Sequence, residues 1–210
     1  MRHQFVLYVP SADGDVKQAE LRPARTNPGK TTGPDEAEMV QRLKDSGRYR
    51  ILQRLDPPPT VPDADTVAFP RLGVVVDTET TGLSAALEEI IEIGAVAFRY
   101  ADDGSIGDVC ATFGALQEPS KPIPADITRI TGITDEMVAG QIIPRAKLEA
   151  LIAEADIIIA HNAGFDRPLL ERFSPVFENK PWACSVKEID WTARGFDGTK
   201  LGYLIGQSGS

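Results

Sequence analysis

The hydrophobic residues of the chain gather in short runs that are separated by polar segments. Four of these runs are rich in β-branched residues and predict buried strands; they cover residues 72–76, 90–98, 108–116 and 156–160. Residues 144–155 instead place apolar side chains three and four positions apart, which predicts an amphipathic helix. Because three strands come first and helices then surround a further strand, the pattern predicts an α/β protein with a mixed sheet that begins as an antiparallel meander.

Residues with helix-capping chemistry predict where further helices begin. Thr134 is followed by two acids, an order typical of a helix start. The pair Ser185 and Glu188 has the spacing of a capping box and predicts a helix that continues to about Arg194. Two more helices are predicted, one after His161 and Asn162 and one over residues 200–205.

Residues 1–70 differ from the rest of the chain in composition and in the pattern of hydrophobic residues. Two short strands are predicted at 4–10 and 49–55, a flexible polar segment at 11–34 and a helix at 35–45. Residues 56–65 are rich in proline, which is typical of a stiff linker. The chain is therefore predicted to consist of an N-terminal extension with its linker, residues 1–70, and a larger domain, residues 71–210.

Composition and charge restrict the function. The chain has 210 residues, 42% of them hydrophobic, and a formal net charge of −9, which disfavours a broad basic surface for long nucleic acid. No apolar run approaches the roughly 20 residues of a membrane span, and no signal peptide is recognisable. The two cysteines, Cys110 and Cys184, lie far apart and predict free thiols in a reducing compartment. We therefore expect a cytoplasmic protein without a membrane partner.

Two carboxylates end the first strand of the predicted domain. Asp77 and Glu79 are two residues apart, so they point to the same side if the strand continues through Thr78. Two neighbouring carboxylates repel each other unless a proton or a cation lies between them, and oxygen ligands suit Mg²⁺ or Mn²⁺. The alternative is a pair of solvated acids at a strand end.

A second polar group follows the strand at 156–160. Asn162 and Asp166 are four residues apart and would share a helix face, with Asp166 in the first turn. The alternative role of Asp166 is a favourable interaction with the helix dipole. Phe165 is predicted to be either part of the core or a platform on which a base stacks.

Together these segments resemble a known family. The resemblance rests on six stretches in the family's order: DTETTGL from Asp77, IIEIGAV from Ile90, ITGITDEMV from Ile130, AHNAGFD from Ala160, WACSVKEIDWTAR from Trp182 and KLGYLIGQSG from Lys200. They are similar to the DnaQ-like 3′→5′ exonucleases of the DEDD superfamily, which include the proofreading epsilon subunit of DNA polymerase III. The resemblance covers about residues 71–208 and implies a ribonuclease-H-like fold.

The resemblance also implies a site and a reaction. Asp77, Glu79 and Asp166 would be catalytic metal ligands in a site for two Mg²⁺ or Mn²⁺ ions beside a terminal phosphodiester. The implied partners are the single-stranded 3′ end of a DNA or RNA and a DNA polymerase subunit. The implied substrate contacts come from both motifs and from the ITGITDEMV turn: Thr78, Thr80, Thr81, Thr131, His161, Asn162 and Phe165. Asp126 is a weaker candidate on the substrate side.

One motif of the family is not matched. Relatives carry a general-base His or Tyr, and then a fourth Asp, soon after the segment that corresponds to residues 200–209. Here only His3 and His161 occur in the sequence, and Asp190 and Asp197 come too early. Since loss of a positioned base costs roughly 10²- to 10⁴-fold, we expect the 210-residue chain alone to be weak or inactive.

Two other functions match parts of the sequence. Residues 28–33, PGKTTG, contain part of a P-loop, but Ala24 stands where that motif needs glycine, which disfavours a P-loop enzyme. The stronger alternative is a non-catalytic module that binds nucleic acid or docks onto a polymerase. The unmatched motif favours this module, whereas the three acids favour the nuclease.

Overall fold

The computed structural model describes residues 35–48, 59–62 and 64–207. The predicted strands at 4–10 and 49–55 and the polar segment at 11–34 lie outside the described residues. The chain forms two compact units, one with α1 (Glu36–Asp45) and one that contains the described residues from 59 onward. Helix α1 confirms the predicted helix, and the Asp35 carboxylate accepts the Glu38 N–H at its start, at 2.8 Å.

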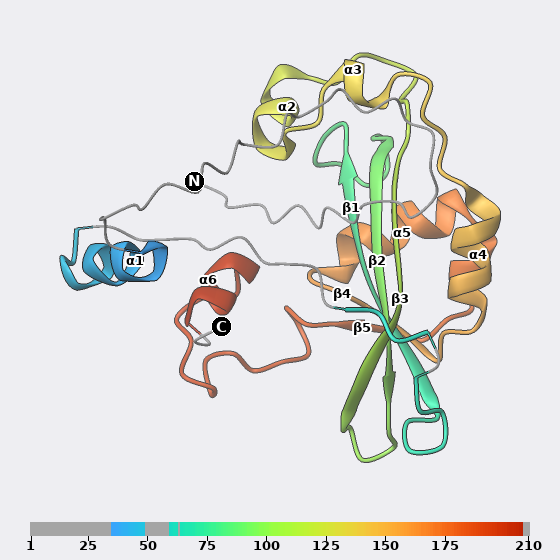
Figure 1. Cartoon of the computed structure of the whole chain (residues 1–210). Coiled ribbons are helices and arrows are strands. Elements are labelled where there is room, and N and C mark those ends of the chain that lie inside the picture. The colour runs from blue at the N-terminus through green and yellow to red at the C-terminus, as the bar shows by residue number, and fades with distance from the viewer. Residues whose placement is uncertain (1–34, 49–58, 63, 208–210) are drawn as a thin grey trace, which may run out of the picture. The chain divides into compact units, whose positions relative to one another are not determined.

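The second unit is built on a five-stranded sheet with the order β3-β2-β1-β4-β5 (Figure 1). Its strands are β1 (Arg71–Thr80), β2 (Ile90–Tyr100), β3 (Ile106–Leu116), β4 (Ile157–Ala160) and β5 (Trp182–Cys184). Strands β1, β2 and β3 pair antiparallel, while β4 is parallel to both β1 and β5. The predicted mixed sheet and its antiparallel meander are confirmed. Strand β5 was not predicted, because three residues are too short to carry a periodic pattern.

Helices follow the strands along the chain. They are α2 (Ala125–Thr131), α3 (Asp135–Val138), α4 (Arg145–Ala153), α5 (Ala163–Phe173), the 3₁₀ turn η1 (Pro175–Phe177) and α6 (Leu201–Gln207). The predicted helices at 144–155, after Asn162 and over 200–205 are confirmed, and Thr134 accepts the Met137 N–H as the N-cap of α3. Helix α2 was missed, because Pro124 before it makes no side-chain cap that a sequence pattern could reveal.

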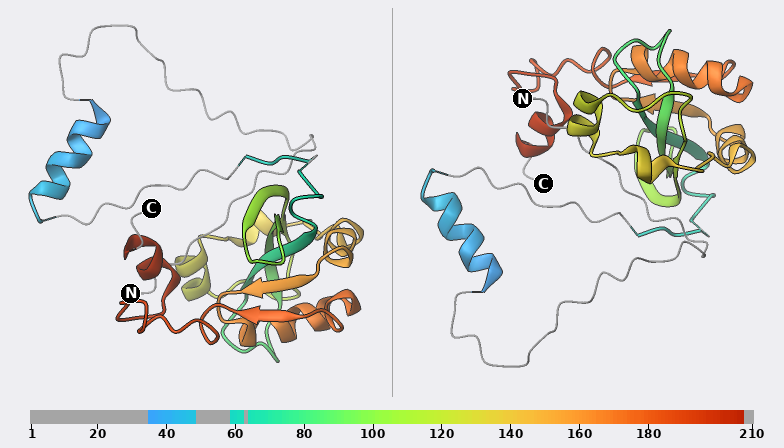
Figure 2. Two further views of the ribbon diagram at one scale, coloured as in Figure 1. Left: turned by 90° about the horizontal axis from the view of Figure 1, so that it is seen from below. Right: turned by 90° about the horizontal axis from the view of Figure 1, so that it is seen from above.

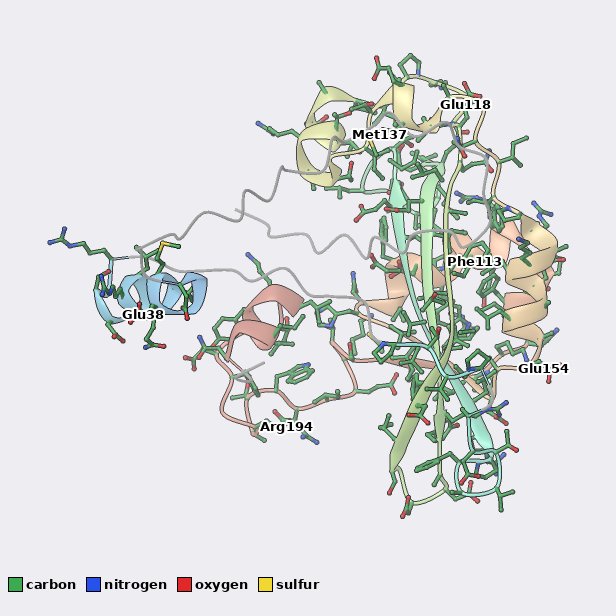
Figure 3. The ribbon with its side chains drawn as sticks, viewed as in Figure 1. Glu38, Phe113, Glu118, Met137, Glu154 and Arg194 are labelled. Carbon is green, nitrogen blue, oxygen red and sulfur yellow. The ribbon has the colours of Figure 1, made fainter. Side chains whose placement is uncertain are left out.

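The main core lies on one face of the sheet. Helices α4 and α5 lie next to each other beside the strands (Figures 1 and 2). Their apolar side chains pack with one face of β1, and the buried residues at this contact include Val74, Val76, Leu148, Ile152, Leu169 and Leu170. Phe113 of β3 belongs to the same cluster and lies on this side of the sheet (Figure 3). Burial of these side chains is the main driving force that fixes α5 against β1.

A smaller cluster closes one end of the sheet. Ile91 of β2 packs there with apolar residues of α2 and α3. Glu118 binds this region to the end of β3, because its carboxylate accepts the Gly140 N–H at 3.0 Å. Glu118 and Met137 are seen at this end of the sheet in Figure 3. The ITGITDEMV segment is therefore a folded cap on the sheet and not an open loop.

The predicted helix at 185–194 is wrong, since these described residues form turns. The two capping-box side chains are used elsewhere. The Ser185 hydroxyl lies 2.8 Å from His161 Nδ1, and the Glu188 carboxylate accepts the Cys184 N–H at 2.9 Å. The Trp191 indole N–H also donates to the Ser185 carbonyl, at 2.6 Å. The Ser185 and Glu188 side chains therefore make other hydrogen bonds in place of those that would cap a helix.

Residues 59–62 and 64–70 precede the sheet, and two of them contact its edge. The Val61 N–H donates to the Val109 carbonyl at 2.8 Å, and Phe69 lies over Gly107. The division at residue 70 into an extension and a domain stays a prediction. Cys110 and Cys184 are both free, with Cys184 buried and Cys110 half-buried. In the described ranges there is no helix that combines the length and apolarity required to span a bilayer.

A glycine in β1 allows close packing between neighbouring strands. A Cβ on Gly73 would lie 2.5 Å from Cζ of Phe98. We expect Gly73→Ala to lower the free energy of unfolding by about 1–3 kcal/mol, because overpacking forces the ring out of place. Urea denaturation of the single and double variants with Phe98→Leu measures this coupling. The cost should shrink in the Phe98→Leu background, and an equal cost in both backgrounds would contradict the packing argument.

Candidate active site

Strand β1 carries both acids of the first motif within its regular part. Asp77 lies opposite Gly94 of β2, and Glu79 lies directly opposite Glu92. Side chains alternate along a strand, so Asp77 and Glu79 face away from the side on which Val74 and Val76 pack. Gly94 has no side chain, so no side chain of β2 lies directly opposite the Asp77 carboxylate. The prediction that both acids point to one side of the strand is consistent with this register.

Asp166 approaches the same point from helix α5. One carboxylate oxygen, Oδ1, accepts two hydrogen bonds from Thr78, from its N–H at 3.1 Å and from its hydroxyl at 2.7 Å. Asp166 is 3% exposed and lies in the first turn of α5, as predicted. Asn162 makes the sharp turn from β4 into α5 with a left-handed φ of 79°, a conformation that asparagine tolerates. The two motifs therefore meet at Thr78.

Burial and mutual repulsion disfavour the charged forms of these acids. Burial first, and then the negative charges of Asp166 and Glu92, together raise the pKa of Asp77 to about 7. Burial likewise raises the pKa of Asp166 to about 6, although its hydrogen bonds from Thr78 act in the opposite direction. Burial also raises the pKa of Glu92. At Asp77, Asp166 and Glu92 the surroundings therefore favour the protonated carboxyl group over the charged carboxylate.

These residues fit a hard divalent cation in chemistry. Carboxylate oxygens are the ligands that Mg²⁺ and Mn²⁺ prefer, and a cation would relieve the repulsion between Asp77 and Asp166. Throughout the described part of the chain, however, no three His, Cys, Asp or Glu side chains are close enough to form a ready metal cluster. The structure brings Asp77 and Asp166 together, and Glu79 as a third ligand stays a prediction.

The threonine hydroxyls of the first motif donate hydrogen bonds to other groups of the protein. Thr78 donates to Asp166, Thr80 donates to the Gly82 carbonyl, and Thr81 donates to the Glu88 carboxylate. Each hydroxyl has one hydrogen to donate, so it can serve a nucleotide only as an acceptor. All three threonines are also buried. Their predicted contact with substrate stays a prediction, while their hydrogen bonds give them a clear structural role.

His161 ties the end of β4 to later parts of the chain. Its Nε2 lies 2.7 Å from the Thr199 carbonyl, which can only accept, so Nε2 carries the hydrogen. Nδ1 then accepts from the Ser185 hydroxyl at 2.8 Å. Both ring nitrogens are thereby engaged in holding the segments before α6. This arrangement gives His161 a structural role and does not suit a free general base, and its predicted contact with substrate stays a prediction.

The other predicted contact residues lie in different surroundings. Phe165 is partly buried against the main core, which fits the core role better than an open platform. Thr131 is buried in α2, where its hydroxyl donates to the Ile127 carbonyl and accepts the Ile133 N–H, each at 3.0 Å. Asp126 is exposed in the first turn of α2. Substrate contacts by these residues stay predictions.

Glu92 was missed as a member of this site. Its signal was present in the sequence, because an acid between Ile91 and Ile93 interrupts an otherwise apolar strand. The register places Glu92 opposite Glu79, and like charges at directly opposed positions are destabilising. The spacing of acids along β1 alone could not reveal this pair, because it depends on how β2 aligns with β1.

Comparison with known proteins identifies the family. The family model of the RNase_T exonucleases matches residues 74–190, more than half of the 210-residue chain. The chain belongs to this exonuclease family. Its resemblance to the DnaQ-like enzymes of the DEDD superfamily is thereby confirmed, and by family it is a phosphodiester hydrolase.

Relatives of the RNase_T exonuclease domain include larger replication proteins. A PolC-type DNA polymerase III of Thermotoga petrophila is 38% identical over 120 residues, 56% of this chain and 8% of that protein. The DNA polymerase III epsilon subunit of Treponema pallidum is 35% identical over 114 residues, 52% of this chain and 49% of that subunit. The match therefore spans about half the length of the epsilon subunit and a small part of PolC.

A solved structure of exonuclease I shares the fold. It superposes with a TM-score of 0.51 at 16% identity, covering 66% of this chain and 36% of that protein. This likeness supports the ribonuclease-H-like exonuclease fold that the motifs implied.

The raised pKa values predict an unusual dependence of stability on pH. A carboxyl group whose pKa is higher in the folded protein stabilises the fold below its unfolded pKa, and this stabilisation is lost as the pH rises through the folded pKa. With chelator present, the protein should therefore lose on the order of 1–3 kcal/mol between about pH 4 and 7 through Asp77.

Urea denaturation at pH 5 and pH 8 measures this loss. Asp77→Asn should remove most of it, so that this variant is more stable than the wild type at pH 8 in the absence of metal. Asp108→Asn, which replaces an exposed acid of β3, is the control and should behave as the wild type. The same pH dependence in the wild type and in Asp77→Asn would rule out Asp77 as the source.

Proposed function

We propose that this chain provides a metal-dependent 3′→5′ exonuclease domain. It releases nucleoside monophosphates from the single-stranded 3′ end of DNA, in proofreading or repair. The observation that carries the proposal is that the buried Asp166 of the second motif accepts two hydrogen bonds from Thr78, the residue next to the half-buried Asp77 of the first motif; both acids also have raised pKa values. Membership of the RNase_T exonuclease family and the likeness to DNA polymerase III proteins support the reaction and the DNA substrate.

The acids would hold the metal ions, with Asp77 and Asp166 as the central pair and Glu79 beside them. Bound Mg²⁺ or Mn²⁺ would supply a nucleophile at neutral pH and stabilise charge on the phosphodiester oxygens. The chain's own residues orient these ligands. Thr78 fixes the carboxylate of Asp166 through two hydrogen bonds, and His161 holds the neighbouring segments at residues 185 and 199.

The surface charge favours a short substrate over a long one. With a net charge of −9, the chain lacks the excess of cations that steers long duplexes to a protein. A few nucleotides at a strand end, contacted mainly through metal-bound phosphate, fit this charge. A polymerase subunit as partner and a cytoplasmic location stay predictions.

The proposal includes a low rate for the 210-residue chain by itself. His161 is one of its two histidines, and both of its ring nitrogens are engaged. Without a positioned base the rate should fall by roughly 10²- to 10⁴-fold. Detection therefore needs enzyme in excess over substrate and long incubation.

The proposal predicts a ladder of products from a 5′-labelled single-stranded DNA oligonucleotide. Shortening from the 3′ end should require Mg²⁺ or Mn²⁺ and should stop in EDTA. Asp77→Asn and Asp166→Asn should each slow it by more than the roughly 10- to 100-fold that loss of a mere supporting residue costs. Asp108→Asn is the matched control, and an RNA oligonucleotide of the same sequence tests the sugar preference.

A Mn²⁺ titration of the same proteins separates the metal site from catalysis. Binding that is lost in Asp77→Asn but kept in Asp108→Asn supports the site even where hydrolysis is slow. Unaltered Mn²⁺ binding in Asp77→Asn, together with no ladder at enzyme excess, would refute the proposal. Tight binding of the oligonucleotide under those conditions would instead favour the non-catalytic binding module.

A further inference from the structure

Arg172 reaches from α5 to the loop that follows the first motif. Its Nη1 donates to the Ala85 carbonyl and its Nη2 donates to the Glu88 carbonyl, each at 2.6 Å. These contacts join residues that are 87 and 84 positions apart in the sequence. The loop, residues 81–89, leads from β1 to β2 and begins directly after Thr80. Arg172 therefore links the helix that carries Asp166 to the strand end that carries Asp77 and Glu79.

Other hydrogen bonds shape this loop from inside. The Thr81 N–H donates to the Glu89 carbonyl at 2.9 Å and closes the base of the loop. The Thr81 hydroxyl donates to the Glu88 carboxylate at 2.7 Å, and a Cβ on Gly82 would lie 2.7 Å from Cδ of Glu88. These contacts set the internal shape of the loop. The position of the loop relative to α5 is set by the Arg172 contacts together with Ala85, which packs against the main core.

The geometry of the contact favours arginine over lysine. A guanidinium group is planar and carries several N–H donors in fixed directions, so it can serve two separate carbonyl oxygens at once. A lysine ammonium keeps the charge but is a single point on a flexible stem. Because Arg172 is exposed, its two hydrogen bonds add little to global stability, and their main effect is on local order.

We propose that Arg172 is a positioning residue for the 3′-terminal nucleotide, which it serves by holding the loop 81–89 in a fixed place relative to Asp166. The inference rests on the proposed nuclease function. The loop begins two residues after Glu79, at the end of β1, so its displacement would disturb the surface next to the acids, where the terminal nucleotide would be received. The metal ligands themselves would stay in place, because Asp166 is fixed separately by Thr78.

The test compares Arg172→Ala and Arg172→Lys with a control from the same helix. Arg167→Ala is that control, because Arg167 is also exposed but donates to Glu171 on its own helix, at 2.7 Å. The first measurement is hydrogen exchange at Leu87 and Glu88, whose N–H groups both donate to the Ser84 carbonyl. Exchange there should be roughly 10-fold faster in Arg172→Ala and unchanged in Arg167→Ala.

The second measurement separates binding of the nucleotide from binding of the metal. The probe is a single-stranded DNA oligonucleotide with a 3′-terminal phosphorothioate linkage, measured by fluorescence anisotropy with Mn²⁺ present. Arg172→Ala should weaken its binding by about 5-fold or more, while the Mn²⁺ affinity should change by less than about 2-fold. Arg172→Lys should restore only part of the lost affinity, because one ammonium nitrogen replaces two guanidinium nitrogens that point at the two carbonyl oxygens in fixed directions.

The outcomes separate this inference from the proposed function. Equal oligonucleotide affinity in the wild type and Arg172→Ala overturns the inference and leaves the function standing, as does unchanged loop exchange. Parallel loss of Mn²⁺ and oligonucleotide affinity also overturns it, since the whole site would then have collapsed. A wild-type protein that binds Mn²⁺ through Asp77 but no oligonucleotide removes the proposed substrate, and the inference with it.

Discussion

Two hydrogen bonds from Thr78 to a single oxygen of Asp166 join the strand of the first motif to the helix of the second. The contact brings a buried carboxylate close to Asp77, although repulsion between them opposes this arrangement. The fold tolerates it because Val74, Val76, Leu169 and Leu170 are held together by burial in the main core. Apolar packing thus holds the charged groups in a position that they would not adopt by themselves.

The sequence predicted those parts of the fold that depend on local pattern. The strands β1 to β4 and the helix α4 follow from runs and spacings of apolar residues, which are properties of short segments. The sequence failed at residues 185–194, where Ser185 and Glu188 make hydrogen bonds to His161 and Cys184 in place of a helix cap. No local pattern contains that information, because His161 is 24 residues away.

The residues of the candidate site also divide into those that a local motif reveals and those that only the three-dimensional structure reveals. Asp77, Glu79 and Asp166 could be identified from motifs, since the acids stand at fixed places within short stretches. Glu92 and Arg172 could not, because their relation to the site depends on strand register and on a contact across 84 residues or more. Family resemblance supplied the reaction, while only the three-dimensional structure supplied the groups that surround its ligands.

The short length of β4 has a consequence for the site. The parallel pairing of β4 with β1 ends at Val75 and Ile159, while β1 continues to Thr80. Beyond that point, none of the strands in the described residues pairs with β1 on this side, so the N–H of Thr78 can donate to a side chain instead of a ladder carbonyl. If β4 were a few residues longer, one of its carbonyl groups would accept the Thr78 N–H within the sheet. Helix α5 would then begin farther from Thr78. The early end of one strand therefore creates the opening in which the carboxylates meet, and the length of β4 is as much a condition of the site as the identity of its acids.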